Sequence, residues 1–171
     1  MINYVNKFFS RIVRLFYINR TLLVFQLANE AKLIESIRLN KIETEDGGFK
    51  LYLVDGDEDV HYSYFNTGVI YCKEVDANIV TDLMYMYRCY TSKEYRNKGL
   101  YREAISLATN MFPESDIYIS VLASNEQSVR VIMKNTSKLC GIYYYRRYFF
   151  FFKKRSYFFN DSNIKIVESN K

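Results

Sequence analysis

The stretch from residue 83 to 134 constrains the fold most, because strand and helix patterns alternate along it. Apolar residues keep helical spacing after Gly99, and Pro113 ends that segment. Ser124 and Gln127 have the spacing of a capping box, which predicts a second helix starting near Asn125. The predicted order is strand Leu83–Tyr90, polar loop Thr91–Gly99, helix Leu100–Met111, strand Ile117–Leu122 and the capped helix.

The flanking segments add strands on both sides of this unit. Residues 22–27 are β-prone, and residues 29–39 have helical spacing. The runs 49–54 and 60–65 flank an acidic turn and predict an antiparallel hairpin. Aromatic runs at 143–152 and 157–159 predict closing strands, followed by a polar tail, 160–171, that we expect to be frayed.

Composition narrows the class of protein. A length of 171 residues with 49% hydrophobic and 25% charged residues predicts one globular domain, which we assign to residues 21–159. Three cysteines without a CxxC pair, and a single histidine, argue against a disulfide framework and a metal site. The chain has no apolar run of the ~18 to 20 residues that a membrane span needs and no signal-peptide pattern, so we expect a cytoplasmic protein.

Residues 2–16 predict an amphipathic helix within a basic N-terminal segment, 1–20. Its apolar stripe faces away from Lys7, Arg11 and Arg14, which is typical of a helix lying at a lipid headgroup boundary. Packing of this helix on its own domain, or on a partner subunit in a homodimer, is an equal alternative. The first interpretation predicts peripheral membrane contact.

Basic residues are concentrated in blocks. The net charge is +5, and residues 127–160 hold eight Lys and Arg with no Asp or Glu. The loop Arg96-Asn97-Lys98-Gly99-Leu100-Tyr101 opens a helix, so unpaired backbone N–H groups and the helix dipole favour an anion there. Gly99 allows close backbone approach, while Arg96, Lys98 and Arg102 add charge. We expect a pyrophosphate site.

The same loop resembles the GNAT acetyltransferase superfamily, whose acetyl-CoA loop follows Q/R-x-x-G-x-G/A. The match falls at Arg96 and Gly99, and Tyr101 departs from it. Residues 94–101 look like bacterial members near polysaccharide and lipopolysaccharide synthesis. A later family motif, an Asn that opens a helix running into a Lys, is similar to the segment from Asn125 through Ser128 and Val129 to Lys134.

The resemblance implies an α+β fold (α/β in some schemes): a mixed, mostly antiparallel twisted sheet, flanked by helices and splayed between two central strands. It implies an N-acetyltransferase that moves an acetyl or similar acyl group from CoA to a primary amine by direct attack, and an amino sugar of a surface glycan is the acceptor we expect. Acetyl-CoA is the cosubstrate, and no metal is implied. The residues implied to bind it are Tyr90, Thr91, Arg96, Asn97, Lys98, Gly99, Leu100, Tyr101, Asn125 and Ser128.

Proton transfer is harder to assign. His61 is the natural acceptor at neutral pH and lies on a strand expected near the acceptor, although a hydrogen-bonded sheet histidine is the alternative. The tyrosine that often serves as the family's acid is replaced by Ile132. Other candidates are the acids Glu74, Asp76 and Asp82 and the tyrosines Tyr101, Tyr143 and Tyr144, whereas Cys89 and Cys140 are expected to be unreactive.

Two alternatives to an active enzyme stay open. A GNAT-shaped adaptor without catalysis fits the missing acid and base. A module for single-stranded nucleic acid fits the aromatic residues interleaved with Arg146, Arg147, Lys153, Lys154 and Arg155, provided that Tyr143, Tyr145 and Phe149 do not face the core.

Overall fold

The computed structural model describes residues 17–27, 38–135, 137–149 and 151–169. The predicted helix 2–16 and nearly all of the predicted helix 29–39 lie outside these ranges. The strands are β1 (Tyr17–Leu27), β2 (Asn40–Glu43), β3 (Phe49–Asp55), β4 (Glu58–Cys72), β5 (Ala77–Thr91), β6 (Ile117–Leu122), β7 (Ser137–Tyr148), β8 (Phe152–Phe159) and β9 (Lys165–Glu168). The helices are the 3₁₀ turn η1 (Lys93–Tyr95), α2 (Leu100–Met111) and α3 (Glu126–Lys134).

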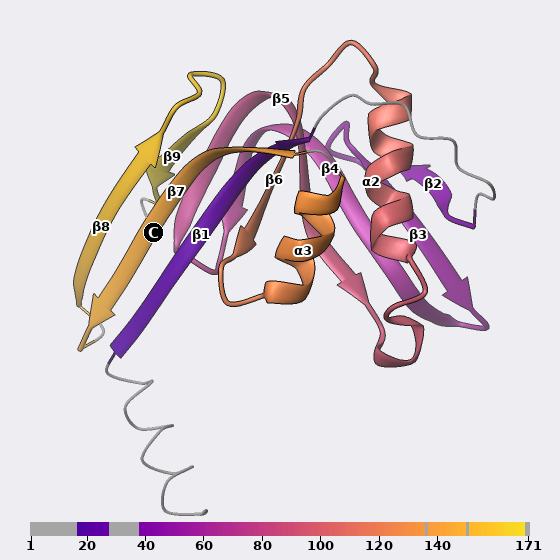
Figure 1. Ribbon diagram of the computed structural model, residues 1–171, viewed down its shortest axis with the longest axis horizontal. Coiled ribbons are helices and arrows are strands. Elements are labelled where there is room, and N and C mark those ends of the chain that lie inside the picture. The colour runs from indigo at the N-terminus through magenta and orange to yellow at the C-terminus, as the bar shows by residue number, and fades with distance from the viewer. Residues whose placement is uncertain (1–16, 28–37, 136, 150, 170–171) are drawn as a thin grey trace, which may run out of the picture.

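All nine strands belong to one mixed sheet (Figure 1). Its order is β2-β3-β4-β5-β6-β1-β7-β8, and β9 pairs with the beginning of β5. The β5–β6 pair is parallel, and the other pairs are antiparallel. A parallel pair requires a crossover, which α2 provides between β5 and β6.

The predicted α+β architecture with helices flanking the sheet is wrong for the described residues. The sheet makes up most of them, and both α2 and α3 pack into the same apolar cluster, on one face. The strands are longer than expected because alternation continues through the acidic region, where Ala77, Ile79 and Thr81 are buried at every second position. Strand pairing therefore extends β4 and β5 beyond the predicted runs 60–65 and 83–90.

Two apolar clusters lie on opposite faces of the sheet. The first contains Leu100, Ala104 and Ile105 of α2, Ile132 of α3 and inward residues of the central strands. The second is rich in tyrosine and is covered without a described helix. An ion pair between Lys153 of β8 and Asp76 joins one edge of the sheet to the β4–β5 turn, so the sheet curls around this cluster.

The segment expected to be a frayed tail is instead part of the sheet. Residues 165–168 form β9 against β5, and Ile164 is buried in the second cluster. Asp161 accepts a hydrogen bond of 2.6 Å from the hydroxyl of buried Tyr118. These contacts hold residues 161–168 against the sheet.

Candidate functional site

An opening in the sheet begins where β5 and β6 cease to pair. Their parallel register ends at Met86 and Ile119. Beyond Met86, β5 keeps β4 as a partner on one side, and the described strands give it none on the other. A bulge re-aims the strand there, because two residues of β5 lie opposite one of β4 and Arg88 has a φ of 46°. Residues 87–91 thus present a backbone edge without a described strand partner, where the Thr91 carbonyl accepts a hydrogen bond of 3.2 Å from Arg96 Nε.

The loop after β5 brings a second set of backbone donors to the same opening. Asn97 and Gly99 both adopt left-handed conformations, with φ of 63° and 84°. Gly99 is the N-cap of α2 and accepts the first helical bond, from the Glu103 N–H, at 2.9 Å. Within the described ranges, no side chain caps this helix. The first N–H groups of α2 therefore have no partner within the helix, and the positive end of its dipole faces the loop.

Between these two elements lies a cleft of about 1250 Å³. All ten residues that the sequence analysis proposed for CoA line it. The lining residues that it did not propose for CoA are Arg38, Cys89, Tyr95, Arg102, Glu103, Ser106, Gln127, Val131, Lys134 and Asn135. The cleft is strongly basic, since Glu103 is the single acid among the lining residues that the structure describes.

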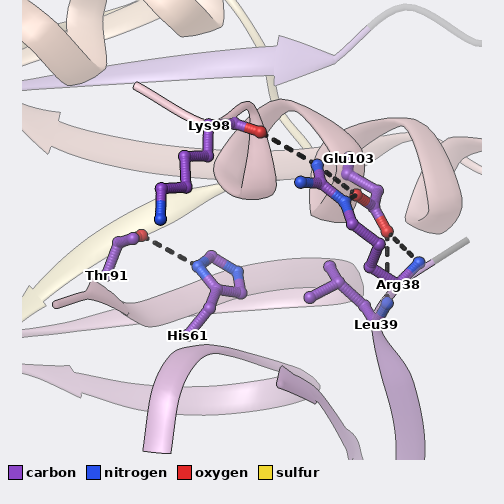
Figure 2. A network of polar contacts seen from close by, with 6 residues as sticks. All are labelled: Arg38, Leu39, His61, Thr91, Lys98 and Glu103. Atoms are coloured by element: carbon purple, nitrogen blue, oxygen red, sulfur yellow. Dashed lines mark hydrogen bonds and ion pairs between the residues drawn. The ribbon is translucent and has the colours of Figure 1, made fainter. Parts of the chain in front are cut away.

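An ion pair between buried Glu103 and the partly exposed Arg38 holds the loop in place (Figure 2). The Glu103 carboxylate accepts hydrogen bonds from the Arg38 and Leu39 N–H groups, at 2.6 and 3.1 Å, and from Arg38 Nε at 2.8 Å. Arg38 also donates to the Lys98 carbonyl at 3.0 Å. The side chain of Glu103 is 5% exposed, so its charge depends on this pairing. The arrangement fixes the start of α2. Four other cations line the cleft, and the described lining residues offer them no second acid: Arg96, Lys98, Arg102 and Lys134.

Sequence reasoning missed Glu103 and Arg38, although one signal was present. Glu103 lies three residues after Leu100 and one before Ala104, on the apolar stripe of the helix. A carboxylate on such a stripe needs a buried partner. Arg38 lies 65 positions earlier in the chain, so no local pattern connects the two.

His61 does not line the cleft. It is fully buried on β4, where its Nδ1 lies 2.9 Å from the hydroxyl of Thr91 and its Nε2 lies 3.2 Å from that of Ser63. Desolvation lowers the pKa of His61 to about 4. The imidazole is therefore neutral at pH 7 and a weak base. This geometry favours the hydrogen-bonded sheet histidine over the predicted proton acceptor.

Tyr101 is the one proposed proton donor that lines the cleft. Burial raises the pKa of its hydroxyl well above the usual range, so the group keeps its proton at neutral pH. Tyr143 instead belongs to the second apolar cluster, and Tyr144 lines a separate small hollow. Glu74, Asp76 and Asp82 do not line the cleft either.

The cysteines show no sign of activation. Cys89 is exposed as a residue and lines the cleft, but desolvation of its sulfur raises the pKa of the thiol to about 12. A nucleophilic cysteine needs a lowered pKa. Among the described residues, no group of three or more His, Cys, Asp or Glu is arranged to hold a metal ion.

The start of α3 forms the opposite wall. Asn125, and not Ser124, is the N-cap, because its side-chain oxygen accepts a hydrogen bond from the Ser128 N–H at 3.3 Å. The predicted capping box was therefore one residue too early. Asn125 and Ser128 both line the cleft, so two segments about thirty residues apart meet across it.

The fold has counterparts among solved structures. Neither a family model nor a curated protein sequence matches the chain. A conserved Staphylococcus epidermidis protein of unknown function matches with a TM-score of 0.56 at 10% identity, covering 81% of this chain. A candidate acetyltransferase of the GNAT family from Novosphingobium aromaticivorans matches with 0.55 at 12% identity, covering 76%. A Drosophila protein matches with 0.51 at 10% identity, covering 85%.

These similarities concern the fold alone. The aligned parts are 64%, 64% and 57% of those three chains, so this chain spans less than two thirds of their length. One of the three is named for acetyl transfer. Separately, the described residues include no helix that is long and apolar enough to cross a bilayer.

Proposed function

We propose that this protein is an acyltransferase that uses a CoA thioester and transfers its acetyl, or a similar acyl group, to a primary amine. The observation that carries this proposal is the cleft between a free strand edge, residues 87–91, and the uncapped start of α2. The fold similarity to a candidate GNAT acetyltransferase supports it.

The chemistry of CoA matches both walls. A diphosphate needs several N–H donors and positive charge at one point, and the start of α2 offers donors beside Arg96, Lys98 and Arg102. The amide-rich pantetheine arm needs an extended hydrogen-bonding partner, and the open edge of β5 has that character. The ten residues named in the sequence analysis form the proposed binding site.

In the proposed reaction, the amine nitrogen attacks the thioester carbon, the carbon–sulfur bond breaks, and the thiolate leaves. The amine gives up one proton and the sulfur takes one. Tyr101 is the proposed donor to the sulfur, because it lines the cleft and stays protonated. Its raised pKa makes the hydroxyl a weak acid, so the transfer requires its oxygen to take up the proton that the attacking amine releases, directly or through water, in the same step. Among the described lining residues, no carboxylate is free to act as a base, since Glu103 is paired with Arg38. The amine therefore enters in its neutral form or passes its proton to water.

Calorimetry with CoA, 3′-dephospho-CoA and pantetheine tests the binding step. If the diphosphate is the main point of attachment, pantetheine binds at least about a hundredfold more weakly than CoA, and 3′-dephospho-CoA stays within about tenfold. The Phe151→Ser variant, altered in the β7–β8 turn and outside the cleft lining, should bind CoA like the native chain. Equal affinity for CoA and pantetheine, or no binding of CoA, would contradict the proposal.

Thiol release with acetyl-CoA and a panel of amines and amino sugars tests the transfer step. An amino sugar is the acceptor we propose, and simple alkylamines are the comparison. Binding of CoA without release by any acceptor would favour the alternative of an adaptor that has lost catalysis. The observation that keeps this alternative is the buried, neutral state of His61.

A further inference from the structure

The turn between β7 and β8 exposes an unusual amount of aromatic surface. Tyr148 and Phe152 pair across the two strands, and the turn between them contains Phe149 and Phe151. Phe149, Phe151 and Phe152 are 61, 83 and 70% exposed. β8 is the last strand of the sheet order, so this hairpin lies at its edge (Figure 1). Exposed aromatic clusters of this kind mark interaction sites.

The exposed aromatic surface continues from the turn onto one face of the sheet. Tyr144, Tyr148 and Phe152 share that face with Tyr17, which pairs with Tyr148 at a ring distance of 5.1 Å. Each of these four side chains is at least 36% exposed. Helix α2 contacts β4 and β5, and α3 contacts β6 and β7, but neither covers these exposed side chains. We call the surface formed by these four residues, Phe149 and Phe151 the aromatic tip.

Next to the aromatic tip, two cations face each other. Arg146 and Lys154 are directly opposite in the β7–β8 register, an arrangement that is destabilising for like charges. No described acid forms an ion pair with either, whereas Lys153 and Arg155 are paired with Asp76. With Tyr144 and Ser156, the two cations line a hollow of about 270 Å³. Two cations and two hydroxyls around one hollow suit a phosphate group.

We propose that this hairpin docks the chain on an anionic lipid bilayer, with the aromatic tip in the acyl boundary and Arg146 and Lys154 on a headgroup phosphate. Lys154 lies two residues from Phe152, which is about 7 Å along a strand. That matches the ~5 to 10 Å by which interfacial elements enter a bilayer. Aromatic rings and flanking cations are the residues that membrane interfaces favour.

Two observations choose a membrane over other occupants. A second copy would bring the same unpaired cations against themselves, which repels, whereas anionic headgroups attract them. The chain before Tyr17 joins the sheet beside Tyr148 and carries Lys7, Arg11 and Arg14 with no acid. The basic N-terminal segment is therefore attached at the same end as the aromatic tip.

Co-sedimentation of the full chain with vesicles tests the proposal. Phosphatidylcholine vesicles that contain about 30% phosphatidylserine should bind it, and pure phosphatidylcholine should bind much less. We expect Arg146→Gln/Lys154→Gln to weaken partitioning about thirtyfold and Phe151→Ser/Phe152→Ser about tenfold. Lys41→Gln/Lys93→Gln, which removes the same charge away from the hairpin, should have a much smaller effect. Equal losses in the two charge variants, or unchanged binding in both hairpin variants, would overturn the proposal.

A fluorescent probe separates insertion from charge attraction. The chain has no tryptophan, so Phe151→Trp gives a single reporter at the aromatic tip, and Ile42→Trp gives one on β2 at the other end of the sheet order. Anionic vesicles should shift the Phe151→Trp emission to the blue and protect it from acrylamide, without affecting Ile42→Trp. Concentration-dependent dimerisation that buries the tip, or a shift produced by single-stranded oligonucleotide and not by vesicles, would contradict the proposal.

Discussion

The cleft and the β7–β8 hairpin are both rich in positive charge, but they differ in how their cations are paired within the chain. At the cleft, Arg38 is used internally, where it pairs with buried Glu103 and holds the Lys98 carbonyl. At the hairpin, Arg146 and Lys154 stand opposite each other without a described acid. The cleft is therefore prepared by contacts within the chain, whereas the hairpin surface is left for a partner to complete.

The largest expected effect compares one ion pair from each region. Glu103→Ala leaves the Arg38 guanidinium and two amides without their acceptor, and should lower the free energy of unfolding by about 3 kcal/mol. Lys153→Ala removes a partly exposed partner of Asp76, whose carboxylate also keeps Arg155, and should cost about 1 kcal/mol or less. Urea unfolding measures both. Similar losses would mean that the cleft is no better organised than the hairpin.

Catalysis should depend on the cleft alone. Tyr101→Phe keeps the ring and removes the hydroxyl, so we expect kcat to fall about a hundredfold with little change in KM for acetyl-CoA. Tyr144→Phe at the hairpin should leave both values unchanged. Steady-state thiol release provides the numbers. An unchanged kcat in Tyr101→Phe would remove it as the proton donor.

The buried histidine beside the cleft should make stability depend on pH. The folded-state pKa of His61 is lowered to about 4, below the ordinary histidine value of 6.5, so the unfolded chain binds the proton more readily between these values. The stability that the neutral His61 provides is fully present above pH 6.5 and is lost as the pH falls towards 4. At pH 5 the free energy of unfolding should be lower by about 2 kcal/mol. His61→Asn should remove this slope in denaturant titrations across that window. An identical slope in the variant would assign it to other groups.

The smallest expected effect concerns one backbone position. Gly99→Val should weaken CoA binding about tenfold, because a β-branched residue resists a φ of 84°. Gly99→Asn should bind nearly as well as the native chain, since Asn tolerates this conformation and the nearest atoms, of Arg38 and Arg102, leave ordinary contact distances. Calorimetry compares the two. Equal affinities would show that the loop conformation is not needed for binding.

The sequence predicted best what depends on local patterns. The helix Leu100–Met111 and the strand Ile117–Leu122 were predicted with their observed ends, because apolar spacing and Pro113 define them. The hairpin of β3 and β4 was also predicted, although β4 runs on to Cys72. The aromatic run 143–152 was too long as one strand, since β7 ends at Tyr148 and β8 begins at Phe152.

What the sequence could not reveal depends on contacts between distant segments. The curl of the sheet rests on Lys153 meeting Asp76, and β9 forms because Ile164 and Ile166 find the second cluster. The helix-flanked architecture was wrong for the described residues. The family resemblance implied helices on both faces of the sheet, whereas the curled sheet itself covers the second apolar cluster on one face. The ring nitrogens of His61 contact the hydroxyls of Ser63 and Thr91 and do not point into the cleft, and no spacing in the sequence indicates this.

Hydrogen exchange with and without CoA tests the central claim most directly. If the N–H groups between residues 97 and 102 hold the diphosphate, saturating CoA should slow exchange in that segment and along residues 87–91, and leave β8 unchanged. Exchange at residues 97–102 that stays the same in the presence of bound CoA would contradict the account.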